Sequence, residues 1–195
     1  MNPNRLFLVS RSPRRREILE KFGYDFDMID PAPEEDRVRY PEDTIHVARS
    51  KIPEVREPGV YLSADTVVFL EGEPLGKPRS KEQAAEYLRR LSGRVHEVVT
   101  GYTVLKFPEG ELRQGLEITE VRFSALGPEE IEWLLAQDHP WDKAGAYGIQ
   151  GFAGLFVPWI RGSYLNVVGL PIERLYPILK RWGIVPRTFP KSSTR

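Results

Sequence analysis

Basic side chains gather where the first apolar segment of the chain meets a predicted helix. Leu6–Val9 is a short apolar run, and Ser12 and Pro13 follow it with the residue types that begin helices. Arg14 and Arg15 then stand in the first turn, beside N–H groups that have no acceptor within the helix. Basic groups oppose the helix dipole at this end, so a bound anion would offset them. The pattern predicts an anion site that suits a polyphosphate, with a solvated basic turn as the alternative.

Further side chains that could act on a phosphate lie along the chain. Asp65 and Thr66 follow the apolar run Val60–Ala64, and Lys51 and Lys77 could each place a point charge on a phosphate. By their residue types alone, the aspartate could equally be a turn residue and the lysines solvated surface groups.

Carboxylates also gather in a loop after the first helix. The segment from Asp30 to Asp36 is stiffened by proline and carries four carboxylates, among them Glu34 and Glu35. Such a loop could supply oxygen ligands to a divalent cation, or it could simply be solvated.

Composition excludes several classes of site and partner. The 195-residue chain has no cysteine, which excludes disulfides, thiolate nucleophiles and cysteine-based zinc sites. Its three histidines, which lack zinc-ligand spacing, are expected to pack or to hydrogen-bond. Lys plus Arg equals Asp plus Glu at 28 each, so no overall field attracts nucleic acid or an anionic membrane. No apolar stretch approaches the length of a membrane span. These features predict a cytoplasmic enzyme with no nucleic-acid or membrane partner.

Strands and helices alternate along the chain, which predicts an α/β fold. Two long alternating runs read as a β-hairpin, which makes the sheet mixed rather than wholly parallel. Because ligands in such folds favour the carboxyl ends of strands, Ser10–Arg15 and Asp65–Thr66 are expected to follow strands and to line one cleft. The expected strands are Leu6–Val9, Tyr24–Ile29, Val60–Ala64, Val67–Leu70, Val95–Phe107, Leu112–Phe123 and Leu155–Ile160, and the expected helices are Pro13 to about Phe22, Asp43–Ile52, Ser80–Leu91, Pro128–Gln137 and Pro171–Trp182.

Seven motifs, in order from about Leu6 to Trp182, resemble those of the Maf family of nucleoside triphosphate pyrophosphatases. The resemblance implies an elongated mixed β-sheet flanked by helices, with two lobes and a central cleft, as in inosine triphosphate pyrophosphatases. It also implies a single two-lobed domain over residues 1–185 and a homodimer. The composition of residues 186–195 predicts a frayed tail. The motifs are Ser10–Arg15, Ser63–Val68, Gly76–Pro78, Leu91–Gly93, Asp142–Gly151, Gly162–Tyr164 and Val167–Pro171.

The resemblance further implies a reaction and a set of residues. Arg14, Thr66 and Gln150 match the branch that hydrolyses dTTP and UTP to the monophosphate and pyrophosphate with Mg²⁺ or Mn²⁺, and modified pyrimidine nucleotides are further candidate substrates. Asp65 aligns with the proton acceptor and is also a candidate metal ligand, together with Glu35. The positions that align with substrate contacts are Ser10, Arg14, Arg15, Lys51, Lys77 and Gln150.

Gln150 also has a chemical reason to read the base. Its amide offers an acceptor beside a donor, which complements the N3–H and O4 edge of uracil or thymine. A flipped amide would serve cytosine, so backbone groups of the glycine-rich segment must help.

Two other functions are alternatives to a dTTP/UTP pyrophosphatase. One is a Maf-type enzyme for 7-methyl-GTP or another base, and the other is a nucleotide-binding regulator of septum formation.

Overall fold

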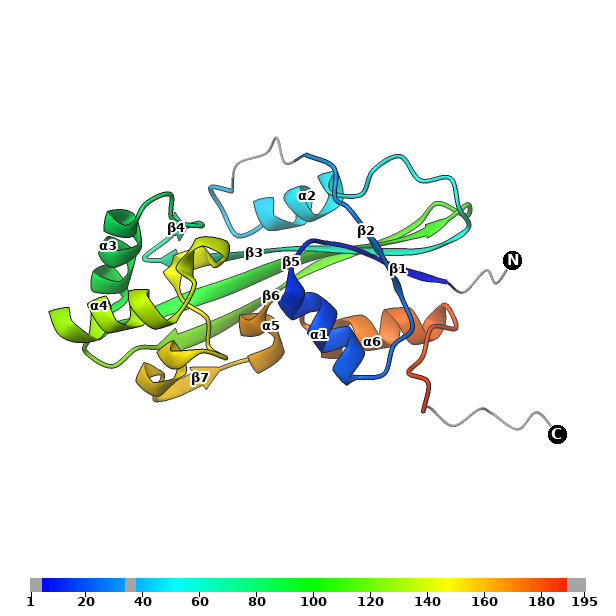
Figure 1. The fold of residues 1–195 in the computed structure, drawn as a ribbon. Helices are drawn as coiled ribbons and strands as arrows, with labels where there is room; N and C mark the ends of the chain where they lie inside the picture. Colours follow the sequence, from blue (N-terminus) through cyan, green and yellow to red (C-terminus); the bar gives the residue numbers. More distant parts are fainter. Residues whose placement is uncertain (1–4, 34–37, 189–195) are drawn as a thin grey trace.

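The computed structural model describes residues 5–33 and 38–188. Figure 1 shows an elongated molecule in which three long strands, β3, β5 and β6, run along much of its length. The strands are β1 (Leu6–Val9), β2 (Asp27–Ile29), β3 (Gly59–Leu70), β4 (Glu73–Leu75), β5 (Val95–Phe107), β6 (Glu111–Arg122) and β7 (Trp159–Arg161). The helices are α1 (Pro13–Lys21), α2 (Asp43–Ser50), α3 (Lys81–Leu91), α4 (Pro128–Gln137), α5 (Tyr164–Val168) and α6 (Ile172–Arg181), with short 3₁₀ turns at Pro140–Asp142, Ala144–Ala146 and Phe152–Phe156.

The sheet is mixed, as predicted. Its strand order is β2-β1-β3-β5-β6-β7, and β4 pairs with β3 outside this path. β1 runs parallel to β2 and β3, whereas β3, β5, β6 and β7 pair antiparallel in sequence. The predicted hairpin is confirmed as β5 and β6, which are joined by a turn at Pro108–Gly110.

Two large apolar clusters lie along one face of β3. Val60 and Leu62 belong to one cluster with α1 and α6, while Val68 and Leu70 belong to a second cluster with α3 and α4. These even-numbered side chains share one face of the strand. Two smaller clusters, around Tyr61 and around Phe69, lie on the other face. The core therefore forms two lobes along the sheet, and the site lies between them.

Several local predictions need correction. Asp65 and Thr66 do not follow a strand: β3 is continuous because Asp65 pairs with Gly101 and Thr66 with Thr100 on β5, which satisfies the backbone there. The strand expected at Leu155–Ile160 is instead a 3₁₀ turn followed by β7, because Pro158 cannot donate to a strand ladder.

The ends of the remaining elements differ in smaller ways. The strand expected from Tyr24 begins only at Asp27, and the short helix α5 was not predicted. At the end of the described chain, the N–H of Arg187 donates to the carbonyl of Gly23 at 2.8 Å; residues 189–195 lie outside the description. Within the two described ranges, no helix is both long enough and apolar enough to cross a membrane.

Candidate active site

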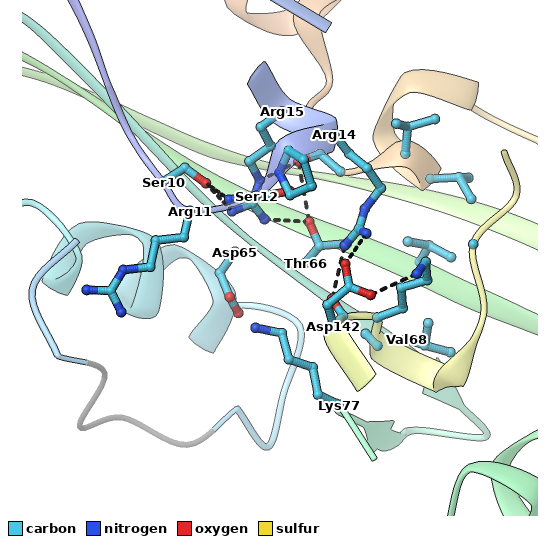
Figure 2. A pocket seen from close by; sticks show the side chains of 18 of the residues that line it. Ser10, Arg11, Ser12, Arg14, Arg15, Asp65, Thr66, Val68, Lys77 and Asp142 are labelled. Atoms are coloured by element: carbon cyan, nitrogen blue, oxygen red, sulfur yellow. Dashed lines mark hydrogen bonds and ion pairs between the residues drawn. The ribbon is translucent and has the colours of Figure 1, made fainter. Parts of the chain in front are cut away.

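The candidate site lies at an interruption in the pairing of one edge of β3. On that edge, β1 pairs with β3 as far as Ser63, and β4 pairs with β3 only from Val68 onward. Between these points, none of the described strands pairs with the edge, and a cavity of about 770 Å³ opens there. Asp65 and Thr66 lie in this interval and point to opposite faces of the strand, yet both line the cavity (Figure 2).

The cavity collects the predicted site residues from segments that are far apart in the chain. They come from the β1–α1 junction, the end of α2, the middle of β3, the segment after β4 and the glycine-rich loop. Glu35 lies outside the described residues. The predicted residues that line the cavity are Ser10, Arg14, Arg15, Lys51, Asp65, Thr66, Lys77 and Gln150.

The junction of β1 and α1 is built by a serine hydroxyl. Ser10 Oγ accepts the N–H of Ser12 at 3.1 Å, which turns the chain into the helix. Ser12 occupies the predicted N-cap position in extended backbone, but its own side chain makes no capping hydrogen bond. Pro13 follows as the first helical residue. The N-terminal end of α1 therefore opens toward the cavity, as the sequence predicted.

Arg15 is a buried cation beneath this turn, with 8% of its surface exposed. Its Nε donates to the carbonyl of Gly169 at 2.8 Å, and its Nη2 donates to Thr66 Oγ1 at 3.0 Å. The Thr66 hydroxyl lies 2.9 Å from that of Thr100 on β5. These bonds connect α1 to the middle of the sheet. They fix the position of the positively charged Arg15 guanidinium.

Arg14 reaches in another direction, toward the loop that follows α4. Its Nη1 donates to Asp142 Oδ2 at 2.6 Å, and its Nη2 donates to the Asp142 carbonyl at 3.0 Å (Figure 2). Lys143 Nζ lies 2.8 Å from the other carboxylate oxygen. Burial raises the pKa of Asp142, but hydrogen bonds from Lys143 and Arg14 outweigh it and hold this pKa below its usual value. Asp142 is thus an anion among cations.

Asp65 forms an ion pair with Lys51. Lys51 Nζ lies 2.6 Å from Asp65 Oδ1 and also donates to the carbonyl of Ala64 at 3.2 Å. Both side chains are largely buried, with 7% of the lysine and 14% of the aspartate exposed. Lys51 follows the last residue of α2, so the packing of that helix on the sheet determines where the ammonium lies.

Lys77 enters the cavity from the opposite wall. It follows β4, is exposed, and points toward the Asp65 side of the cavity (Figure 2). Among the described residues, no hydrogen bond or ion pair joins it to another side chain. The cavity therefore has one lysine that solvent reaches, Lys77, and one that is paired with a carboxylate, Lys51.

Residues of the glycine-rich loop also line the cavity. Gln150 lines it with an exposed side chain, and no described residue hydrogen-bonds to its amide. Tyr147 belongs to this loop and is buried, and its hydroxyl lies 2.7 Å from His96 Nε2. Burial lowers the pKa of His96 to about 4, so this ring is neutral near pH 7. His96 accordingly packs and hydrogen-bonds, as the sequence predicted for the histidines.

The sequence reasoning assigned no role to some residues that line the cavity. Asp142 and Lys143 appear in a quoted motif, but neither residue type marks a site without the Arg14 contact. Arg11 extends from the rim and pairs with Asp30 at 3.0 Å. Tyr147 belongs to the same motif, Asp142–Gly151, but no role was assigned to it, because a buried aromatic residue is typical of a core.

Comparisons with known proteins give consistent relatives. A family model described as "Maf-like protein" matches residues 5–182. A protein named dTTP/UTP pyrophosphatase from Carboxydothermus hydrogenoformans is 45% identical over 184 residues, covering 92% of this chain and 99% of the relative. Proteins of the same name from Pyrococcus horikoshii and Clostridium perfringens are 45% and 40% identical and cover 90% and 92% of this chain, with 95% and 98% of their own lengths matched.

Proposed function

Because this chain belongs to the Maf-like protein family, we propose that it is a nucleoside triphosphate pyrophosphatase that hydrolyses dTTP and UTP to the monophosphate and pyrophosphate. The relatives above carry that activity in their names and match almost all of their own length. One observation on the molecule carries the proposal: the same cavity is lined by Arg14, Lys51 and Lys77 and by the exposed Gln150. A triphosphate and a base need both kinds of group.

The cationic end suits a polyphosphate. Arg14, Lys51 and Lys77 reach it from three different segments, and the N-terminal end of α1 opens beside them. Guanidinium groups bind phosphate oxygens as planar forks, whereas ammonium groups act as point charges. Together they would neutralise the oxygens that otherwise repel an incoming nucleophile.

Asp65 is the residue we assign to the attacking water. Lys51 holds its Oδ1, which leaves Oδ2 to accept a proton or to hold a cation. In hydrolysis, the water oxygen bonds to the α phosphorus and its proton passes to a base. The bond from that phosphorus to the bridging oxygen then breaks, and pyrophosphate leaves with the electron pair. The Lys51 contact would keep the carboxylate oriented throughout.

A divalent cation fits this donor set. Asp142 is a poor ligand because Arg14 and Lys143 occupy its two oxygens, so Asp65 is the better one. Within the described residues, no three His, Asp or Glu side chains group as a metal site. Mg²⁺ needs only one or two carboxylates, because substrate phosphates and water complete its shell. Glu35 stays a predicted second ligand. When bound, the cation would neutralise phosphate oxygens and acidify water.

The loop end suits a pyrimidine. The exposed Gln150 side chain lines the same cavity as the apolar side chains of Val68, Val98 and Val167. An amide can pair with the N3–H and O4 edge as the valines contact the ring. Because Gln150 is exposed, neighbouring loop amides must contribute to the choice of base.

The proposal is tested by measuring pyrophosphate release from a panel of nucleoside triphosphates with Mg²⁺ or Mn²⁺. The panel holds dTTP, UTP, dCTP, dGTP, 7-methyl-GTP and modified pyrimidine nucleotides. We expect dTTP and UTP to be preferred, and Asp65→Asn to lose about 10²-fold or more in kcat, as is typical when a general base is removed.

A matched control separates this loss from a general effect of removing a carboxylate. Asp25→Asn changes an exposed aspartate outside the cavity and should leave turnover unchanged. Preference for a purine nucleotide would overturn the pyrimidine assignment. Absence of turnover with every nucleotide would overturn the enzymatic assignment and favour a nucleotide-binding regulator.

Two further expectations belong to the same proposal. The family resemblance implies a homodimer, which light scattering of the purified protein would test. A cytoplasmic location is part of the same proposal, and cell fractionation would test it.

A further inference from the structure

Asp142 connects two segments that line the cavity, the start of α1 and the loop that carries Gln150. It accepts both Nη groups of Arg14, one on its carboxylate at 2.6 Å and one on its carbonyl at 3.0 Å. Arg14 belongs to α1, and Asp142 begins the segment that reaches Gln150. The two residues are 128 positions apart in the chain. The Arg14 side chain, which we assign to the phosphates, is therefore bound to both the main chain and the side chain of Asp142.

The contact leaves Arg14 able to bind substrate. Each Nη of a guanidinium carries two hydrogens, and Nε carries another. The two bonds to Asp142 use one hydrogen on each Nη. The remaining N–H groups can donate to phosphate oxygens while the contact persists, so Asp142 would orient the guanidinium rather than compete with the substrate for it.

The loop that follows Asp142 is anchored at several other points. Lys143 Nζ donates to the carbonyl of His139, and the N–H of Gly145 donates to the carbonyl of Gly76 at 3.1 Å. Ala146 has a positive φ of 65°, a conformation that a residue with a side chain keeps only when its neighbours enforce it. Of the anchors named, the one that reaches α1 is Asp142. A displacement of α1 would therefore be transmitted to this strained segment through Asp142.

We propose that Asp142 is a positioning residue that couples phosphate binding at α1 to the placement of the base-reading loop. A triphosphate held by Arg14 would thereby hold Gln150 in register with the base. The inference rests on the proposed function for its kinetic consequence. The coupling itself concerns only the two segments and can be measured without turnover.

The first test uses inorganic tripolyphosphate with Mg²⁺, a probe that has no base. Amide hydrogen exchange is followed in peptides covering residues 10–19 and 143–151 of the full-length protein. In the wild type, we expect the probe to slow exchange in both segments. In Asp142→Ala, we expect it to slow exchange in residues 10–19 only, because the charge-assisted bond to the carboxylate is lost and the main-chain carbonyl alone does not hold the loop.

The second test measures the choice of base. We expect Asp142→Ala to raise KM for dTTP about tenfold, as for the loss of one charge-assisted contact, with a smaller change in kcat. The preference for dTTP over dCTP should fall in parallel. Asp142→Asn keeps a neutral side-chain oxygen that can accept from Arg14 and should show an intermediate effect, which makes the result independent of any folding defect in the alanine variant.

Asp138→Asn is the matched control. The Asp138 carboxylate also holds this region, since it accepts the N–H groups of Phe152 and Ala153 at 3.2 Å, but it lies outside the cavity lining. This variant should lower thermal stability and leave the dTTP to dCTP ratio and the loop response to tripolyphosphate unchanged.

The possible failures are distinguishable. Loop protection that persists in Asp142→Ala, or that is absent from the wild type while residues 10–19 are protected, would overturn the coupling alone. An unchanged KM and base preference in an active Asp142→Ala enzyme would do the same. No protection of residues 10–19 in the wild type would contradict the phosphate site, and with it both the inference and the proposed function.

Discussion

The ammonium of Lys51 lies 2.6 Å from one carboxylate oxygen of Asp65, in a pair that is largely buried. The two residues reach each other from different layers: Lys51 follows the end of α2, and Asp65 lies in the middle of β3. A buried carboxylate without its cation is costly, so the pair contributes to folding as well as to the site. Substitutions at the two positions can measure the contribution of the pair to stability and its contribution to activity.

Replacing Lys51 with methionine should remove the charge while filling most of the space. We expect the free energy of unfolding to fall by about 3 kcal/mol, because Asp65 is left buried and unpaired. Activity should fall at least tenfold. The double variant Lys51→Met with Asp65→Asn should regain most of the lost stability and none of the activity. Denaturant unfolding and pyrophosphate release measure the two effects, and a double variant as unstable as the single one would contradict this account.

Gly101 controls how closely α2 approaches the sheet. A Cβ on this residue would overlap the backbone of Thr44 and Ile45, and backbone cannot move aside as a side chain can. Gly101→Ala should therefore destabilise the protein by about 2–3 kcal/mol and lower kcat, since the displaced helix carries Lys51. Gly76→Ala, where a Cβ meets nothing within 4 Å, is the control for stability. Thermal unfolding of both variants decides the matter, and equal melting temperatures would refute the argument.

Gln150 should determine the base in part. Because its amide is exposed, water can replace a lost hydrogen bond, and the effect of its removal should be modest. We expect Gln150→Ala to reduce the preference for dTTP over dCTP about tenfold with little change in melting temperature. Competition assays with both nucleotides in one mixture measure the ratio directly. A ratio equal to that of the wild type would assign base choice to the loop backbone.

His96 should make stability depend on pH in the acidic range. Its pKa is lowered to about 4 by burial, from 6.5, so below pH 6.5 the unfolded chain binds a proton that the folded protein does not. The contribution to stability is complete above pH 6.5 and is lost as the pH falls toward 4, by about 3 kcal/mol in all. His96→Gln should lack this component. Urea unfolding at pH 7 and pH 4.5 measures how much stability each protein loses between the two pH values. Equal losses in the two proteins would contradict the prediction.

Removal of divalent cations should abolish turnover without unfolding the protein. The apolar clusters that form the core contain no metal ligands, so chelation by EDTA should leave the melting temperature of the substrate-free protein unchanged. Added Mg²⁺ or Mn²⁺ should restore pyrophosphate release. Full activity in excess EDTA would show that Asp65 and the basic residues act without a cation.

Local sequence signals predicted much of the fold because they depend on neighbours in the chain. The proline after Ser12 begins α1, and the serine before α3 caps it, since Ser80 Oγ accepts the N–H of Gln83 at 3.2 Å. The turn at Pro108–Gly110 joins the predicted hairpin. Predictions failed where distant pairing decided the outcome. The polar pair Asp65–Thr66 read as a strand end, but twelve residues of β3 continue through it because β5 supplies their partners.

The sequence by itself determined the chemical inventory of the site: basic groups at a helix start, an aspartate, two lysines and a glutamine in a glycine-rich segment. Only the tertiary structure decided which of them meet. The register that pairs Val9 with Ser63 ends β1 just short of Asp65, and the pairing of Val68 with Leu75 starts β4 just beyond Thr66. Arg14 meets Asp142 across 128 residues for the same reason. Residue types and spacing act within a few positions of the chain, whereas strand register and helix packing bring together groups that no local rule connects.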